Sequence, residues 1–221
     1  MTEKSEIFII GASGHGREVL WLLQELNAAG QRFQIAGFLD DAEDKQGQTI
    51  CGVPVVGPID ALRELPGRSV ALGVGLPHVK RKILSRIGDW DLSWPTLVAP
   101  GVRCSPHVEL GRGATVFWGS VLTTQVRVGD FALVNLNCTL SHDVTVGQGS
   151  MISPGTHLTG NVSVGDWVSV GTGVATIPGV HVGDFAVVGA GTVLISDVAP
   201  GSTVVGNPGR VVATRDEAEL A

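Results

Sequence analysis

His142 and Asp143 are neighbours in the second half of the chain and form its best candidate pair for acid–base chemistry. An imidazole exchanges protons near neutral pH, so it is well suited to act as a general base. The neighbouring carboxylate can orient the ring and raise its basicity. Because adjacent strand residues point to opposite faces, this pairing requires a bend in the chain at His142. Without further information, a merely solvated outward histidine remains the alternative.

A glycine-rich turn near the start of the chain is the second candidate site. Its residues, Gly11 to Gly16 (GASGHG), follow a short apolar run and precede a helical apolar stripe. The N–H groups at the start of such a helix can bind a phosphate or a sugar hydroxyl. Ser13 stands where the dinucleotide fingerprint has its second glycine, which disfavours a nicotinamide cofactor. Tight packing alone is the other explanation of the turn.

Residues 1–92 have the pattern of a small Rossmann-like α/β domain. Strands are predicted at residues 6–10, 34–39 and 70–73, an edge segment at 53–56, and helices at 17–29, 59–65 and 79–87. Asp40 ends the second strand, where it either accepts hydrogen bonds from a ribose or caps a loop. Residues 90–100 are the predicted connector to a second domain at 93–221.

A six-residue period fills this second domain. Steps of six from Leu110 to Leu194 meet a large aliphatic residue at fourteen of fifteen positions, and the fourth residue after each is small or β-branched. Neither a helix nor an alternating strand has this period, whereas a parallel β-helix does, with about 18 residues in each three-sided coil. The hexads predict about five coils, preceded by a less regular coil at residues 98–108. Glycine often follows the aliphatic residue, where we expect a corner to need an unhindered backbone.

Composition argues against several classes of function. The net charge of −6 is spread without long runs of one sign, which is unlike a binder of nucleic acids or anionic membranes. No leader and no membrane-spanning stretch of about 20 apolar residues is present, so we expect a cytoplasmic protein without membrane insertion. Three cysteines without CxxC spacing predict reduced thiols and no metal site, and Cys138 is expected to be packed in the core.

Four motifs carry a resemblance to a known family that spans nearly the whole chain. The run NLNCTLSHD at residues 135–143, GTHLTGN at 155–161, VGNPGR at 205–210 and the glycine turn together resemble the bacterial sugar acetyltransferases related to sialic acid O-acetyltransferase. The hexads themselves resemble the hexapeptide-repeat transferases. The resemblance implies a left-handed β-helix, a homotrimer and acetyl-CoA as co-substrate. It also implies N-acetylation of a UDP-4-amino-4,6-dideoxy sugar or a similar nucleotide-linked amino sugar.

The resemblance assigns roles to individual residues. His142 is expected to accept the proton and Asp143 to raise its basicity, while the Gly160 N–H holds the thioester carbonyl. Thr172 and Ala190 fall where the family contacts the coenzyme. The sugar-nucleotide site is assigned to Gly11, Ser13, Gly14, His15, Asp40 and Gly75, and the N-terminal domain would present the sugar to the prism of the same or an adjacent subunit.

Two departures from the family pattern leave alternatives open. Met151 stands where many relatives have a second histidine that contacts the coenzyme. The loop at residues 73–78 lacks the Gly-Asp/Asn-Asn motif that is common in relatives, so the sequence does not define which sugar and which nucleobase the protein prefers. Two other functions therefore remain as alternatives. One is O-acetylation of sialic acid, which needs the same general base, and the other is a non-catalytic, trimeric scaffold that binds sugar nucleotides and needs no base. A zinc carbonic anhydrase is disfavoured because the His-x-x-x-x-His spacing is missing.

Overall fold

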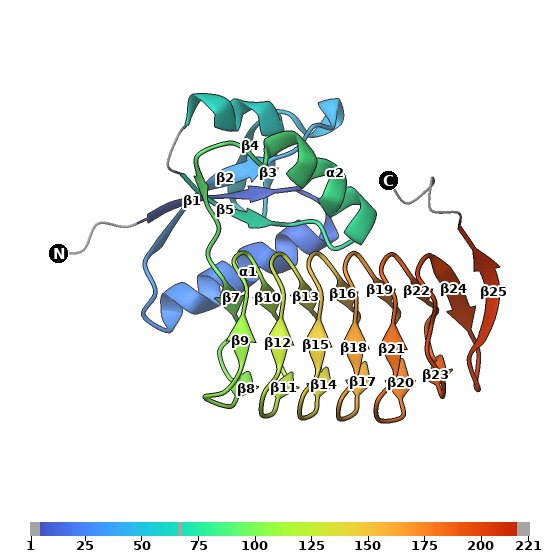
Figure 1. The fold of residues 1–221 in the computed structure, drawn as a ribbon. Coiled ribbons are helices and arrows are strands. Elements are labelled where there is room, and N and C mark those ends of the chain that lie inside the picture. The colour runs from blue at the N-terminus through green and yellow to red at the C-terminus, as the bar shows by residue number, and fades with distance from the viewer. Residues whose placement is uncertain (1–4, 66–67, 216–221) are drawn as a thin grey trace. The chain divides into compact units, whose positions relative to one another are not determined.

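The computed structural model describes residues 5–65 and 68–215 of the chain. The chain divides into two compact units, Met1–Gly75 with Val79–Pro100, and Leu76–His78 with Gly101–Ala221 (Figure 1). Within the described ranges, no helix combines the length and the apolar character that crossing a bilayer requires.

The first unit is a twisted sheet with strand order β3-β4-β2-β1-β5-β6. Its strands are β1 (Ser5–Ile10), β2 (Phe33–Leu39), β3 (Thr49–Ile50), β4 (Val53–Gly57), β5 (Arg68–Leu72) and β6 (Leu92–Ser93), and its helices are α1 (Gly14–Ala28), α2 (Pro77–Ile87) and the short 3₁₀ helices η1 (Glu43–Lys45) and η2 (Ile59–Glu64). β1 lies between β2 and β5 and is parallel to both. Ile7, Ile9 and Ile10 of β1 are fully buried, as expected for a strand covered on both faces.

Two details of this sheet differ from the prediction. The segment at residues 53–56 is not at the edge, because β3 pairs with β4 on its outer side. The predicted connector at residues 90–100 contains β6, which extends the sheet beside β5. It also contains β7 (Leu97–Val98), which falls within the first unit but begins the first sheet of the β-helix. Two-residue strands carry too little periodicity to be recognised in a sequence.

The second unit is a left-handed parallel β-helix with three flat sheets. The first sheet holds β7, β10 (Thr115–Val116), β13 (Leu133–Val134), β16 (Met151–Ile152), β19 (Ser169–Val170), β22 (Val187–Val188), β24 (Ser202–Val205) and β25 (Arg210–Thr214). The second sheet holds β8 (Arg103–Cys104), β11 (Val121–Leu122), β14 (Thr139–Leu140), β17 (His157–Leu158), β20 (Ala175–Thr176) and β23 (Val193–Leu194). The third sheet holds β9 (Glu109–Leu110), β12 (Arg127–Val128), β15 (Thr145–Val146), β18 (Ser163–Val164) and β21 (His181–Val182). Paired residues on neighbouring coils are 18 positions apart, for example Thr139 and His157. β25 runs antiparallel to β24 and ends the stack.

The two registers read from the sequence form the core of this prism. The second residue of each two-residue strand from β10 to β23 points inward, and from Val116 to Leu194 every one of these side chains is buried. The small or β-branched residues of the other register, from Ala114 to Val198, are buried as well. Cys138 belongs to this second register and is fully buried, which raises the pKa of its thiol through desolvation. Each coil therefore buries its apolar positions only by stacking on the next coil.

The chain turns each corner through a residue with a left-handed backbone. These residues recur every six positions and comprise Gly113, Gly119, Gln125, Phe131, Asn137, Asp143, Gly149, Gly155, Asn161, Trp167, Gly173, Gly179, Phe185 and Gly191. Glycine, asparagine and aspartate adopt this conformation more readily than other residues, so much of the series follows their usual preference.

The glycines that follow the aliphatic residues serve another purpose than predicted. Gly147 and Gly165 lie two residues before the left-handed corner position and are not left-handed themselves. A Cβ atom on Gly147 would overlap the backbone of Gly165 and the Asp166 carboxylate on the next coil. These glycines are therefore required because stacked coils approach closely, and not because the corner needs an unusual backbone conformation.

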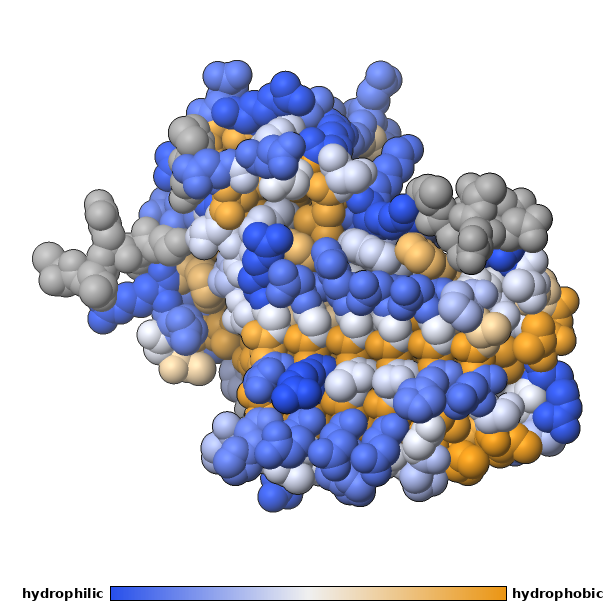
Figure 2. Space-filling view, in the orientation of Figure 1, coloured by the Kyte–Doolittle hydropathy of each residue, from blue (hydrophilic) through white to orange (hydrophobic). Residues whose placement is uncertain are grey.

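The face that carries β9, β12, β15, β18 and β21 shows an apolar band between polar rows (Figure 2). A shallow groove of about 710 Å³ follows this face, floored by Val146, Val164 and Val182 and bordered by carboxylates such as Asp166 and Asp184.

Candidate active site

The imidazole of His142 and the carboxylate of Asp143 are paired on a corner of the β-helix. His142 Nδ1 lies 2.8 Å from Asp143 Oδ2. The bend that this pairing requires is the corner itself, because Asp143 has a left-handed backbone with φ of 60°. The side chains are 57% and 53% exposed, respectively, so both can meet a ligand from solvent. If Nδ1 donates its proton to the carboxylate, the lone pair of the ring is at Nε2, as a general base requires.

Gly160 lies one coil after His142, in the same column of corner residues. A Cβ atom built on Gly160 would overlap Cε1 and Nε2 of the His142 ring. The main chains of the two coils are also joined here, because the Asn161 N–H donates a hydrogen bond of 3.0 Å to the His142 carbonyl. The structure thus brings together three of the residues assigned by resemblance, His142, Asp143 and Gly160.

The two other predicted coenzyme residues lie on a different corner of the prism. Thr172 and Ala190 follow strands of the first sheet, whereas His142 and Gly160 follow strands of the second. Thr172 and Ala190 occupy equivalent positions on successive coils, and both are exposed. Met151 opens β16 of the first sheet and pairs with Leu133 and Ser169.

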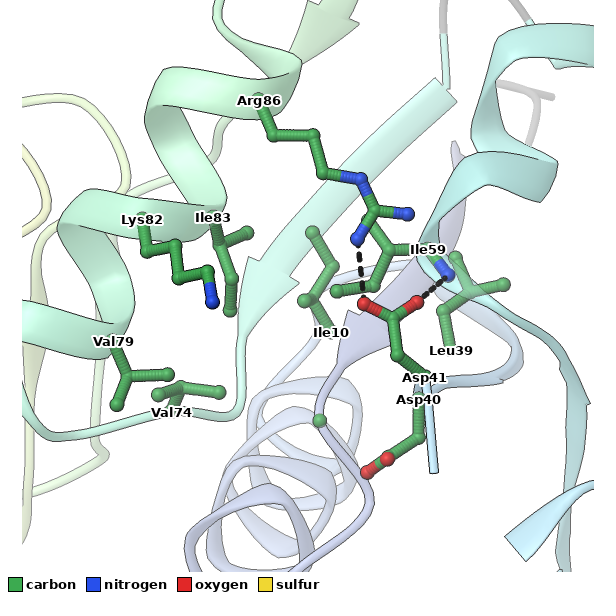
Figure 3. Close-up of a pocket in the computed structure, with 11 residues that line it drawn as sticks. Ile10, Leu39, Asp40, Asp41, Ile59, Val74, Val79, Lys82, Ile83 and Arg86 are labelled. Carbon is green, nitrogen blue, oxygen red and sulfur yellow. Dashed lines mark hydrogen bonds and ion pairs between the residues drawn. The ribbon is translucent and has the colours of Figure 1, made fainter. Parts of the chain in front are cut away.

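A pocket of about 290 Å³ lies at the carboxyl ends of the parallel strands in the first unit (Figure 3). Ile10 ends β1, Leu39 ends β2, and Val74 follows β5, so the pocket opens where the chain moves from one side of β1 to the other. Open α/β sheets bind ligands at this switch point. Its aliphatic walls are completed by Ile59, Val79 and Ile83.

The polar side chains of this pocket are tied into a network. Arg86 Nη1 lies 2.6 Å from Asp41 Oδ2, and Arg86 also pairs with Asp60. The Ile59 N–H donates to the other Asp41 oxygen at 2.9 Å. In Figure 3 the Asp41 carboxylate faces Arg86, whereas the Asp40 carboxylate points away from it. Arg86 therefore fixes Asp41, and Lys82 brings a second cation to the pocket wall.

Asp40 holds the glycine turn in place. Its carboxylate accepts hydrogen bonds from the N–H groups of Ala12 and Ala42 and from Lys45 Nζ, at 2.8, 3.0 and 2.8 Å. Lys45 Nζ also donates to Ser13 Oγ at 2.9 Å. Partial burial opposes ionisation of Asp40, but these hydrogen bonds outweigh it and lower the pKa of the carboxyl group. Asp40 thus has a structural role in addition to any contact with a ligand.

Two of the three glycines of the turn, Gly11 and Gly16, are explained by packing, whereas a Cβ atom on Gly14 would meet only Arg17 Nη2, at 3.9 Å. A Cβ atom on Gly16 would overlap the Gly11 carbonyl, and one on Gly73 would come within 2.7 Å of the same oxygen. Gly11 itself has a left-handed backbone, and its N–H donates to the Leu39 carbonyl at 2.7 Å. Helix α1 can therefore approach the end of β1 only because these residues lack side chains.

Of the six predicted sugar-nucleotide residues, the pocket brings together two, Gly11 and Asp40. Ser13, Gly14, His15 and Gly75 do not line it. His15 pairs with Glu18 at 2.9 Å, and its pKa is lowered mainly by burial, against the opposing effect of Glu18. Sequence reasoning missed Asp41, Lys82 and Arg86. The two consecutive aspartates at the end of a strand were a visible signal, but nothing near them in the sequence pointed to a partner on α2.

Burial also changes the protonation of Lys80 on α2. This side chain is only 1% exposed, and desolvation lowers its pKa to about 7. Among the residues that the structure describes, no group of three or more His, Cys, Asp or Glu side chains is arranged to hold a metal ion.

Comparison with known proteins identifies relatives for both units. Residues 6–87 match the family described as the PglD N-terminal domain. The acetyltransferase domain of PglB from Neisseria gonorrhoeae FA1090, solved with acetyl coenzyme A, is 31% identical; the match covers 95% of this chain and 100% of that domain with a TM-score of 0.87. No curated protein matches the sequence significantly.

Two further solved structures are similar over most of the chain. A mutant of perosamine N-acetyltransferase from Caulobacter crescentus, in complex with CoA and GDP-perosamine, is 29% identical, with 96% of this chain and 98% of that chain covered and a TM-score of 0.84. WeeI from Acinetobacter baumannii AYE is 27% identical, with 95% and 100% covered and a TM-score of 0.83. By fold and by sequence, this chain is an acetyltransferase that belongs to the family of bacterial sugar acetyltransferases.

Proposed function

We propose that the chain transfers the acetyl group of acetyl-CoA to the amino group of a nucleotide-linked amino-deoxy sugar, with His142 as general base. The observation that carries this proposal is the hydrogen bond between His142 Nδ1 and Asp143 Oδ2 on an exposed corner. The sugar amine attacks the thioester carbonyl carbon while Nε2 accepts the amine proton. The carbon–sulfur bond then breaks, and the coenzyme leaves as a thiol after the imidazolium returns the proton.

The tetrahedral intermediate of this reaction carries an oxyanion that needs a hydrogen-bond donor. We assign this role to the Gly160 N–H, next to the imidazole. Within the part of the chain that the structure describes, this N–H donates to no acceptor. A donor already engaged in the β-helix ladder could not serve, so this free N–H supports the assignment.

The pocket of the first unit is the proposed site for the nucleotide. Its aliphatic walls suit the faces of a nucleobase, and Lys82 and Arg86 offer N–H donors. Uracil presents two carbonyl oxygens that such donors can bind, so the pocket is compatible with the UDP-linked 4-amino-4,6-dideoxy sugar that we propose as the substrate. The C. crescentus relative binds GDP-perosamine, so a guanosine-linked sugar is the competing substrate.

We propose acetyl-CoA as the co-substrate because the N. gonorrhoeae relative was solved with it. In addition to Gly160, Thr172 and Ala190 are the proposed contacts of the coenzyme. Since these two residues lie on another corner of the prism than His142, one coenzyme reaches both corners most simply when they belong to adjacent subunits. This arrangement favours a homotrimer, in which each active site uses two chains.

A thiol-release assay with acetyl-CoA tests the proposal. UDP-, GDP- and dTDP-linked 4-amino sugars serve as amine acceptors, and sialic acid serves as a hydroxyl acceptor. We expect turnover with an amino sugar, and His142→Ala should lower kcat by about a hundredfold or more without a change in melting temperature. The exposed His107 provides a matched control, and His107→Ala should leave kcat unchanged. Acetylation of sialic acid alone would support the O-acetyltransferase alternative, and full activity of His142→Ala would exclude His142 as the base.

A further inference from the structure

The environment of Gly160 differs from that of the β-helix glycines that follow an aliphatic residue. At Gly147 and Gly165 the atoms that a Cβ would meet belong mainly to the next coil's main chain and its aspartate. At Gly160 the three nearest atoms all belong to the His142 ring, with Nδ1 at 3.0 Å and Cε1 and Nε2 in overlap. The space that this glycine leaves open is therefore filled by the imidazole.

Backbone conformation does not explain the glycine. Gly155 and Gly173, on neighbouring coils, have left-handed backbones with φ of 68° and 70°, whereas Gly160 is not left-handed. An alanine at residue 160 would thus be compatible with the main chain. Gly160 is buried although it stands beside an exposed corner, as expected if the ring covers it.

We infer that Gly160 is a positioning residue, which lets the His142 ring lie against the next coil and so fixes the direction of Nε2. The inference rests on the proposed function, in which Nε2 accepts the proton of the substrate amine. Asp143 holds the ring at Nδ1, and the Gly160 surface supports the edge that carries Cε1 and Nε2. With 57% of its side chain exposed, His142 has few other contacts to define its orientation.

Gly160→Ala separates this role from that of the oxyanion donor, because alanine keeps the N–H and adds only a Cβ. The displaced atoms belong to a partly exposed ring that can rotate away, so the fold should tolerate the change. We expect kcat to fall about 10- to 100-fold, since a misplacement of about 1 Å in a catalytic group costs this much. The KM for acetyl-CoA and the melting temperature should change little.

A double-mutant cycle shows whether Gly160 acts through His142. In a His142→Ala background, Gly160→Ala should lower kcat by less than about twofold, because no ring remains to be displaced. Nitrogen NMR of the imidazole gives a second readout. The wild type should show one tautomer with the proton on Nδ1, and Gly160→Ala should show a mixture. Gly101→Ala is the matched control: Gly101 has φ of 83° and open space around its Cα, so alanine should lower the melting temperature but leave kcat unchanged.

The possible outcomes distinguish the inference from the proposed function. If His142→Ala abolishes turnover and Gly160→Ala does not reduce it, the positioning role is wrong and the general base stands. An equal loss from Gly160→Ala in both backgrounds would also overturn the inference, because the effect would then not pass through the ring. If His142→Ala leaves turnover intact, both the inference and the proposed base fail.

Discussion

Replacing Asp143 by asparagine tests the contribution of the carboxylate to the base. The left-handed backbone of Asp143, with φ of 60°, suits asparagine as well as aspartate, so Asp143→Asn should leave the corner intact. The variant removes the negative charge that faces His142 Nδ1 at 2.8 Å. Asparagine can also present its NH₂ group to the ring, which would favour the tautomer with the proton on Nε2.

The expected loss follows from the strength of this contact. A hydrogen bond to a charged group contributes about 1.5–3 kcal/mol when it is well shielded. Both side chains are more than half exposed, so screening by water reduces the value to about 1–2 kcal/mol. Because 1.36 kcal/mol corresponds to a tenfold change in rate, kcat should fall about 5- to 30-fold. In the Ser-His-Asp triad, where the aspartate is buried, the same substitution costs about 10⁴-fold.

The assay is steady-state thiol release at saturating acetyl-CoA and amino-sugar nucleotide. Asp130 provides the control, because its exposed carboxylate pairs with Arg112 away from His142, and Asp130→Asn should retain full kcat. If Asp143→Asn keeps kcat within about twofold of the wild type, the carboxylate does not assist the base, and the hydrogen bond between His142 and Asp143 does not contribute to catalysis.

Two further predictions concern stability. Gly147→Ala should lower the free energy of unfolding by about 2–3 kcal/mol, measured by urea denaturation, because its Cβ would strike the next coil; an unchanged value would refute the packing explanation. The lowered pKa of Lys80, about 7, means that the unfolded chain binds more protons than the folded chain above pH 7, so stability should rise by up to about 1 kcal/mol per pH unit from pH 7 to 8.5. Lys80→Met should remove this slope, and a slope that persists in the variant would assign it to other groups.

The β-helix could be predicted almost residue by residue because its pattern is rigid. Each coil repeats after 18 residues, and an inserted residue would turn the inward side chains outward. The spacing of inward residues such as Leu140 and Leu158 therefore predicts the coil directly from the sequence. The role of the glycines could not be predicted in the same way. The sequence shows Gly147 after an aliphatic residue, but not the distance between stacked coils that excludes a side chain there.

The candidate site was predictable only in part. The sequence pointed to His142 and Asp143, but their pairing depends on a left-handed corner at an aspartate, which six-residue periodicity alone does not reveal. Asp41 meets Arg86, 45 residues further along the chain, and this contact arises only when α2 packs beside the strand ends. The role of Lys45 could not be predicted from the sequence, because its Nζ reaches both Asp40 and Ser13 only in the folded turn.

The most direct test of the central claim is a crystal structure of the wild-type protein with coenzyme A and a UDP-linked 4-amino sugar. The proposed mechanism predicts that the amine nitrogen of the sugar lies about 3 Å from His142 Nε2, beside the coenzyme thiol. An amine bound beyond the reach of Nε2, with the thiol directed to another corner of the prism, would contradict the mechanism.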